Sequence, residues 1–133
     1  MRYMLDTNIC IYIIKHKPEN AIRRFLEHDP YDICVSSITY AEMMHGVEKS
    51  AAKERNRLAL MAFLSAITIR DFGAQAAEEY GSIRAELEMK GTPIGPMDML
   101  IAGHARSEGL VLVTNNTREF DRVSGLGVED WSI

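Results

Sequence analysis

Short apolar segments alternate along the chain with longer stretches in which apolar residues recur every three or four positions. The segments at 3–5, 32–35 and 110–113 have the length and the polar flanks of buried strands, and weaker candidates lie at 68–70 and 128–131. Strands that alternate with helical stretches are typical of a mainly parallel sheet with helices on both faces. The pattern therefore predicts an α/β/α sandwich with a central, mainly parallel sheet.

Prolines and glycines mark where the helical stretches begin and end. Pro18 and Pro96 each suit the first turn of a helix, because the fixed φ of proline is helical and its missing N–H would have no partner there. Gly109 is suited to end a helix. The spacing of apolar residues predicts helices over about 9–15, 18–26, from 38 onward, 53–67, 73–90 and 96–108.

The predicted helix 53–67 is apolar over more of its circumference than packing against a sheet requires. Its two apolar rows consist of Leu58, Met61 and Ala62 and of Leu60, Phe63, Leu64 and Ile67. We therefore expect another protein chain to cover part of this helix.

Length and composition narrow the class of protein. The 133 residues fit one domain, 1–133, and 47% hydrophobic with 26% charged residues is ordinary for a globular chain. A net charge of −4 argues against general adhesion to nucleic acid. Cys10 and Cys34 lie in apolar surroundings and are interpreted as buried thiols in a reducing cytosol. The chain shows no signal-peptide pattern and no apolar run of about 20 residues, so we expect a cytoplasmic protein with no membrane association.

Polar side chains follow three of the predicted strands. They form the clusters Asp6-Thr7-Asn8, Ser36-Ser37 and Thr114-Asn115-Asn116, the last with Glu119 one helical turn further on. Because the carboxyl ends of parallel strands meet at one edge of a sheet, we expect these clusters to lie together. The helices that carry Glu42 and Asp98 start from the same edge. The sequence therefore predicts a pocket that Asp6, Glu42, Asp98 and Glu119 share.

Each of these acids also has a purely structural interpretation. Asp98 in the first turn of its helix would complement the helix dipole by about 0.3–1 kcal/mol. Thr39-x-x-Glu42 matches a capping box, although Ser36 or Ser37 is the better candidate for the helix cap. Glu42-x-x-His45 resembles the helical pair of di-iron bundles, but those sites need two such pairs and two further Glu residues.

Convergence of the acids would require a cation. Two carboxylates about 5 Å apart repel by about 3 kcal/mol at an effective dielectric near 20, which is a large fraction of the stability of a small domain. Oxygen ligands without Cys or His suit Mg²⁺ or Mn²⁺ rather than zinc. Such an ion keeps bound water and can activate it to attack a phosphodiester, so the pattern favours metal-dependent phosphodiester hydrolysis.

Five segments in order along the whole chain resemble one known family. They are Met4-Leu-Asp-Thr-Asn8, Ser36-Ser-Ile-Thr-Tyr-Ala-Glu42, Gly91-Thr-Pro-Ile-Gly-Pro-Met-Asp98, Ile101-Ala-Gly-His104 and Leu112-Val-Thr-Asn-Asn-Thr-Arg-Glu-Phe120. Together they resemble VapC toxins, the PIN-domain ribonucleases of toxin–antitoxin pairs.

The resemblance implies a Mg²⁺- or Mn²⁺-dependent endoribonuclease that forms a homodimer. It also implies a VapB-type antitoxin whose C-terminal segment lies along the active-site groove, and contact with operator DNA only through that antitoxin. Within the family, the chain is most similar to toxins that cut initiator tRNA in its anticodon loop.

The resemblance also implies roles for individual residues. Asp6 and Asp98 would be metal ligands, and Glu42 would assist directly or through water. The fourth acid is open, because many PIN domains have Asp where this chain has Asn116; it is either Glu119 or absent. The remaining polar side chains of the strand-end clusters would contact substrate or support the acids, or serve as helix caps: Thr7, Asn8, Ser37, Thr114 and Asn116.

Two other classes of protein share acids at strand ends. A phosphatase or phosphotransfer domain of similar topology would need a second Asp two residues after Asp6, or a Lys after the 110–113 strand, and the chain has neither. A catalytically silent binding module would need no acids, so the presence of Asp6, Glu42 and Asp98 counts against it.

Overall fold

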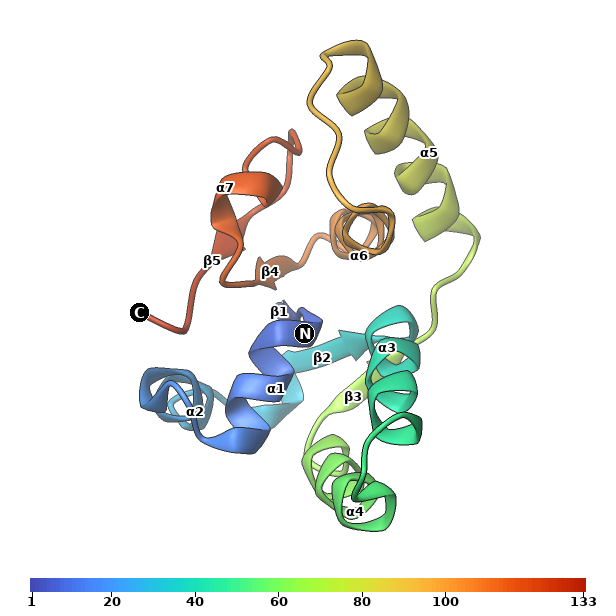
Figure 1. Ribbon diagram of the computed structural model, residues 1–133. Helices are drawn as coiled ribbons and strands as arrows, with labels where there is room; N and C mark the ends of the chain where they lie inside the picture. Colours follow the sequence, from blue (N-terminus) through green and yellow to red (C-terminus); the bar gives the residue numbers. More distant parts are fainter.

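The computed structural model describes residues 1–133 and places five strands in one sheet (Figure 1). The order across the sheet is β3-β2-β1-β4-β5, and all four pairings are parallel. The strands are β1 (Tyr3–Leu5), β2 (Ile33–Ser36), β3 (Thr68–Arg70), β4 (Val111–Val113) and β5 (Val128–Glu129). The predicted parallel sheet is therefore confirmed, including both of its weaker strands.

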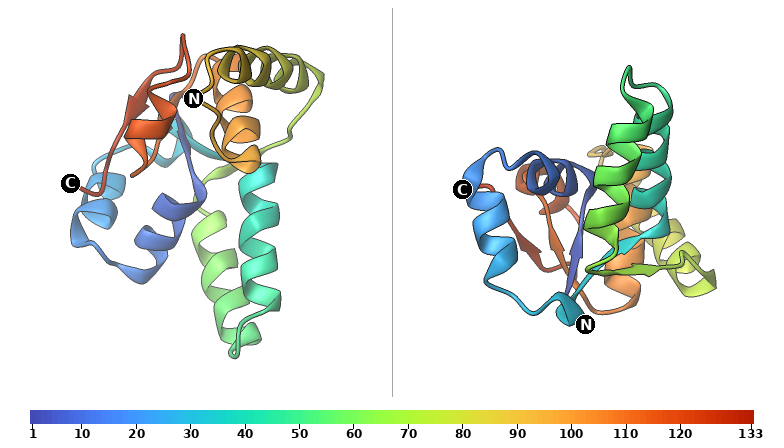
Figure 2. Two further views of the ribbon diagram at one scale, coloured as in Figure 1. Left: turned by 45° about the horizontal axis from the view of Figure 1, so that its top comes forward. Right: turned by 90° about the horizontal axis from the view of Figure 1, so that it is seen from below.

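Seven α-helices surround the sheet and form layers on its two faces (Figure 2). They are α1 (Thr7–Lys15), α2 (Glu19–Leu26), α3 (Ser37–Glu48), α4 (Lys53–Leu64), α5 (Ala74–Met89), α6 (Pro96–Ser107) and α7 (Thr117–Phe120), with a short 3₁₀ helix at Pro30–Asp32. No helix combines the length and the apolar character needed to cross a bilayer.

Alternate residues of each inner strand enter two separate cores. Tyr3 and Leu5 pack with α1, α2, α3 and α4, whereas Met4 between them packs with α5 and α6. Cys34 and Leu112 join Met4 on that second face. This alternation follows from the two-residue period of a strand and explains why the inner strands have no polar side chain before their carboxyl ends.

Two helix ends differ from the sequence prediction. α1 begins at Thr7 rather than near residue 9, because the Asp6 carboxylate accepts a hydrogen bond from the Ile9 N–H at 3.0 Å and so caps the helix two residues earlier. α4 ends at Leu64 rather than 67. The amides of Ala66 and Ile67 bond to carbonyls three residues back, which turns the chain into β3.

Close packing of α5 on α6 fixes the helix that carries Asp98. Gly103 of α6 lies so near α5 that a Cβ added to it would stand 2.8 Å from the backbone nitrogen of Tyr80 and 3.0 Å from its Cα. Only glycine permits this approach without a shift of one helix. Asp98 is therefore held on a rigid helix pair.

The strand order switches beside the central strand, and such a switch point is where parallel sheets form a ligand-binding crevice. The chain adds β2 and β3 on one side of β1 and then β4 and β5 on the other. In parallel sheets, ligands bind at the carboxyl ends of the strands where the order switches, which here is the end of β1 and β4. Asp6 follows β1 and Thr114 follows β4, so both lie at this switch point.

Candidate active site

Asp6 lies at the carboxyl end of β1 and is only 5% exposed. Burial raises its pKa from an ordinary value of 3.8 to about 6; hydrogen bonding from Thr114 and from the Ile9 N–H opposes the rise, and the negative charges of Asp98 and Glu42 add to it. The charges of two acids from distant parts of the chain therefore act on this buried carboxylate.

Asp98 lies in the first turn of α6, half-buried, directly after the turn that contains Gly95. Burial raises its pKa first, and the charges of Glu119 and Glu42 raise it further. Gly95 lies beside this carboxylate, and a Cβ added there would stand at ordinary van der Waals distance, 3.4 Å, from Asp98 Oδ2. The predicted position of Asp98 in the first turn of its helix is confirmed.

Glu42 extends from α3 toward the start of α1. Its Oε1 accepts a hydrogen bond from the Thr7 hydroxyl at 2.6 Å, which joins the polar residues after β1 to the helix after β2. The capping-box interpretation of Glu42 is wrong, since Thr39 is buried within the helix and Ser36 is the cap, with its Oγ accepting from the Ile38 N–H at 3.0 Å.

Glu119 lies on the short helix α7, on the Asp98 side of the crevice. Its Oε2 accepts a hydrogen bond of 2.9 Å from the side-chain amide of Asn116, whose own backbone N–H donates to the Thr114 hydroxyl at 2.9 Å. The acid that resemblance to PIN domains would place at Asn116 is thus replaced by an amide that holds Glu119. Glu119 raises the pKa of Asp98 and is not among the causes that shift that of Asp6.

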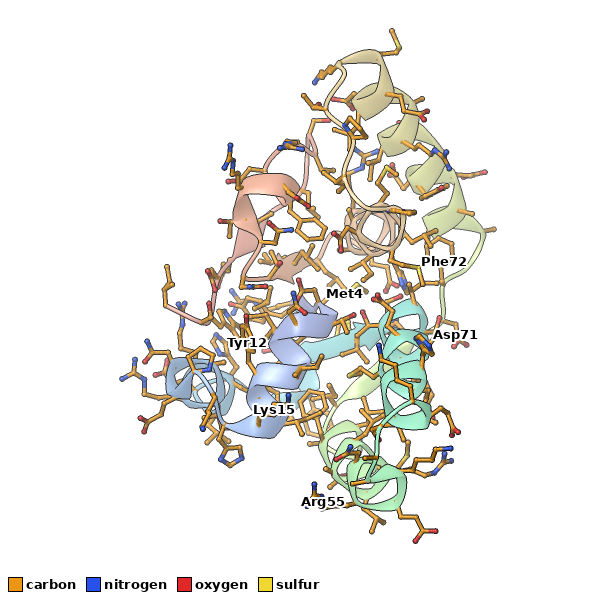
Figure 3. All side chains as sticks on the ribbon, in the orientation of Figure 1. Met4, Tyr12, Lys15, Arg55, Asp71 and Phe72 are labelled. Atoms are coloured by element: carbon orange, nitrogen blue, oxygen red, sulfur yellow. The ribbon has the colours of Figure 1, made fainter.

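Two further predicted polar residues, Asn8 and Ser37, differ in their hydrogen-bond partners. Asn8 is exposed beside Asp6 and donates to the Asn115 side chain at 3.5 Å. The amide of Asn115 in turn donates at 3.1 Å to the hydroxyl of Tyr12, which lies on α1 (Figure 3). Ser37 is engaged elsewhere: its hydroxyl accepts from the backbone N–H of Phe72 at 3.0 Å. Asn115 was missing from the predicted site residues, although its place directly after β4 is the signal that could have found it.

The cluster carries negative charge without a cationic side chain. None of the ion pairs in the structure includes Asp6, Glu42, Asp98 or Glu119. In this arrangement, no three His, Cys, Asp or Glu side chains lie close enough together to hold a metal ion. The donor set consists of oxygen atoms on acids that no cation compensates, and this is the type of ligand that Mg²⁺ and Mn²⁺ prefer.

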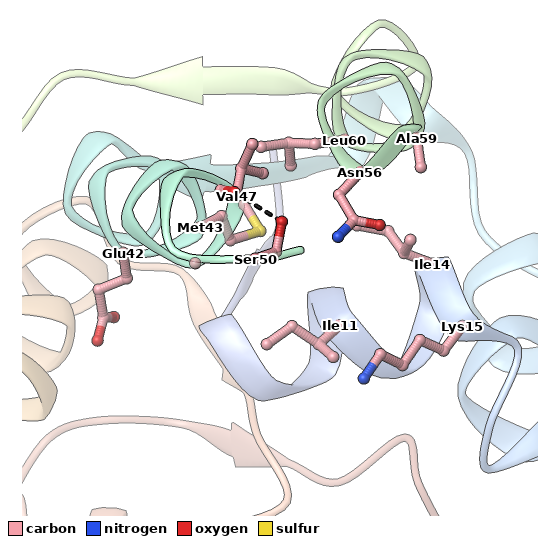
Figure 4. A pocket seen from close by; sticks show the side chains of 11 residues that line it. Ile11, Ile14, Lys15, Glu42, Met43, Val47, Ser50, Asn56, Ala59 and Leu60 are labelled. Carbon is pink, nitrogen blue, oxygen red and sulfur yellow. Dashed lines mark hydrogen bonds between the residues drawn. The ribbon is translucent and has the colours of Figure 1, made fainter. Parts of the chain in front are cut away.

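An apolar groove leads away from Glu42 between α1, α3 and α4 (Figure 4). Ile11, Ile14 and Leu60 line it, and Lys15 lies along its edge. A second hollow between α1, α2 and α4 shares Ile14 with the first and is lined by Phe25 and other apolar side chains. The helix that the sequence predicts to meet a partner, α4, forms one wall of both.

Comparison with known proteins agrees with this architecture. The family profile of the PIN domain matches residues 3–126. A tRNA(fMet)-specific endonuclease VapC from Shigella flexneri is 52% identical over 132 residues, 99% of each chain. The chain superposes with a TM-score of 0.93 on DNA-bound VapBC from Salmonella typhimurium, at 52% identity and 98% coverage of each chain. For VapBC2 from Rickettsia felis bound to a promoter DNA fragment, the TM-score is 0.92 at 45% identity, with 98% and 99% coverage. The chain therefore belongs to the PIN-domain family and, within it, to the VapC proteins.

Proposed function

We propose that this protein is the toxin of a toxin–antitoxin pair and acts as a Mg²⁺- or Mn²⁺-dependent endoribonuclease. The observation that carries the proposal is that Asp6 lies near enough to Glu42 and Asp98 for their charges to raise its pKa, while no cationic side chain pairs with any of the three. A buried carboxylate whose pKa is raised to about 6 is costly to keep charged, and a divalent cation offsets that cost.

The residues of the crevice would divide the work of phosphodiester hydrolysis. Asp6 and Asp98 would hold the cation, with Glu42 as a third ligand or as the acceptor for a proton from the attacking water. When bound, the cation supplies an activated water and positive charge for the phosphate oxygens. Thr7 fixes the Glu42 carboxylate through the 2.6 Å hydrogen bond, which limits the directions from which Glu42 can take a proton.

We propose tRNA as the substrate, with the anticodon loop of initiator tRNA as the cleaved segment. The Shigella flexneri relative that supports this is named for activity on tRNA(fMet) and covers 99% of the chain. An unpaired loop suits a crevice that is open at the sheet edge, since bases of a loop can splay apart. Such an activity belongs in the cytoplasm, where both free, buried cysteines would stay reduced.

We propose that the apolar groove beside Glu42 receives the C-terminal segment of a VapB-type antitoxin. The groove begins at an acid of the site and is apolar along α1 and α4, so an amphipathic segment lying there would also cover the crevice. The VapBC complexes from Salmonella typhimurium and Rickettsia felis support this pairing, and their bound DNA supports operator contact through the antitoxin. Leu58 on α4, 72% exposed, supports a further protein contact, and we propose a homodimer.

The proposed function is tested with purified toxin freed of antitoxin and incubated with total tRNA. We expect cleavage with Mg²⁺ or Mn²⁺, none in excess EDTA, and recovery when Mn²⁺ is restored. Sequencing of the new RNA ends is expected to place them in the anticodon loop of initiator tRNA.

Two carboxylate-to-amide variants give the matched control. Asp98→Asn removes a proposed ligand, whereas Glu78→Gln makes the same chemical change at an exposed site on α5. We expect only the first to abolish cleavage. Undiminished cleavage in EDTA would contradict the metal mechanism, and new ends outside tRNA would contradict the substrate.

A further inference from the structure

His104 is a buried polar side chain that the proposed chemistry does not use. It lies on α6, is 1% exposed, and its ring Nδ1 stands 2.8 Å from the hydroxyl of Ser36. Burying an imidazole costs free energy unless its nitrogen atoms find partners. An aliphatic side chain could fill the same space without the free-energy cost of burying polar atoms. We therefore ask what the contact between His104 and Ser36 does.

The direction of the Ser36–His104 hydrogen bond follows from the neighbouring groups. Nε2 of His104 lies 2.8 Å from Oε2 of Glu108, with a geometry short of a regular hydrogen bond. A carboxylate only accepts, so the ring proton belongs on Nε2 and leaves Nδ1 as an acceptor. Burial lowers the pKa of His104, which favours this neutral ring. The Ser36 O–H therefore donates to Nδ1.

This direction orients the Ser36 hydroxyl for its second contact. With its proton directed at His104, its lone pairs face the Ile38 N–H, which donates to Oγ at 3.0 Å and caps α3. His104 thus fixes the rotamer of the side chain from which α3 starts. The Ser36–His104 contact is the only side-chain hydrogen bond that joins α6 to the segment 36–48.

The two bonded residues lie at equal distances along the chain from two acids of the site. Glu42 is six residues after Ser36 on α3, and Asp98 is six residues before His104 on α6. At a rise of about 1.5 Å per residue, each acid stands about 9 Å along its helix from the bond. A small tilt of either helix about this point changes the separation of the two carboxylates.

The start of α5 and the end of α6 close around the same bond. Phe72 presents its ring edge-on to His104, with centroids 5.5 Å apart and planes at 79°, and lies between β3 and α5 beside the start of α3 (Figure 3). Arg70 binds Glu108 at 2.6 Å and so holds the carboxylate that faces Nε2. The ring of His104 is thereby held by Ser36 at the start of α3, by Phe72 before α5 and, through Glu108, by Arg70 of β3.

We propose that His104 is a positioning residue of the nuclease, which acts through Ser36 to set the placement of α3 against α6 and hence of Glu42 against Asp98. The proposal rests on the proposed function. Loss of the Nδ1 contact is therefore expected to lower turnover even in variants that stay folded. Misplacement of catalytic groups by a fraction of an ångström to 1 Å costs on the order of 10 to 100-fold in rate.

Two amide variants separate the two ring nitrogens. In His104→Asn, the shorter amide reaches the place of Nδ1 and can accept from Ser36; in His104→Gln, the longer amide reaches toward Glu108 and leaves Ser36 without its partner. We expect the Asn variant to keep kcat within about threefold, and the Gln variant to lose on the order of tenfold in kcat with KM unchanged. Urea unfolding of both variants shows whether either is destabilised.

Binding of Mn²⁺, measured by calorimetry on the same variants, gives a readout that does not depend on cleavage. We expect His104→Gln to weaken it on the order of tenfold and His104→Asn to leave it near the wild-type value. Ser36→Ala is the second variant if His104→Gln fails to fold; it is expected to reproduce the losses in kcat and Mn²⁺ affinity.

Equal losses in the Asn and Gln variants, or losses that follow only the unfolded fraction, would overturn the positioning role. So would wild-type kcat and Mn²⁺ affinity in a folded His104→Gln or Ser36→Ala protein. If the wild-type protein itself leaves RNA uncut, the proposed function fails. In that case the Mn²⁺ affinities of the variants still test whether His104 positions Glu42 against Asp98.

Discussion

Replacement of Asp6 by Asn is expected to stabilise the metal-free protein while abolishing cleavage. The substitution keeps the shape of the side chain and keeps the cap of α1, because Asn caps helices as well as Asp does. It removes only the charge. Since Asp6 is 5% exposed and near two other acids, that charge is the costly part of the residue.

The magnitude follows from the pKa of Asp6, which is about 6 in the folded protein against an ordinary 3.8. A difference of about two units corresponds to about 3 kcal/mol. Below pH 3.8 the carboxyl is protonated in both states and costs nothing. Between 3.8 and 6 the unfolded chain releases the proton first, so stability falls as pH rises, and above pH 6 the full cost is present.

Urea unfolding in EDTA between pH 4 and pH 7.5 measures this cost. Over that range, wild-type protein is expected to lose about 2.5 kcal/mol more of its free energy of unfolding than Asp6→Asn, because part of the cost is already present at pH 4. Added Mn²⁺ is expected to restore stability to the wild-type protein only. Parallel pH profiles for the two proteins, or equal stabilisation of both by Mn²⁺, would show that the charge of Asp6 does not destabilise the metal-free fold.

Three further predictions concern the other acid, the helix packing and the groove. Asp98→Asn is expected to abolish RNA cleavage and, because it removes one repelling charge, to raise the melting temperature in EDTA; a folded variant that cuts RNA at the wild-type rate would contradict this. Gly103→Ala is expected to destabilise the fold by about 1–3 kcal/mol, because its Cβ would stand 2.8 Å from the Tyr80 backbone nitrogen, whereas Gly81→Ala, whose Cβ meets nothing within 4 Å, is expected to stabilise it by up to about 1 kcal/mol. Chemical denaturation of both variants checks the sign. Ile14→Asp, in the wall shared by both hollows, is expected to abolish capture of the antitoxin in a pull-down and leave tRNA cleavage by the free toxin intact; retained capture would place the antitoxin elsewhere.

The strands and the edge where the acids meet could be predicted from the sequence because their causes are local. An apolar run such as 3–5 needs no partner to be recognised as a buried strand, and Asp6 at its end marks the edge of a parallel sheet. The position of Asp98 followed in the same way from Pro96 and the apolar helix behind it.

Contacts between distant segments could not be predicted in this way. Ser37 and Ser36 look alike in the sequence, yet one accepts from the Phe72 backbone and the other meets His104, because the packing of α5 and α6 decides which hydroxyl faces which neighbour. The hydrogen bond between Asn115 and Tyr12, 103 residues apart, likewise depends on how α1 lies against the end of β4. Tertiary packing, rather than local pattern, sets these partners.

We propose that acids far apart in the sequence hold one divalent cation in the crevice beside β1. Anomalous diffraction from crystals of the antitoxin-free protein soaked in Mn²⁺ tests this most directly. We expect a manganese peak bound by carboxylate oxygens of both Asp6 and Asp98, and no such peak in Asp98→Asn crystals. Manganese bound elsewhere, or no manganese in crystals of a protein that cuts tRNA under the same conditions, would contradict it.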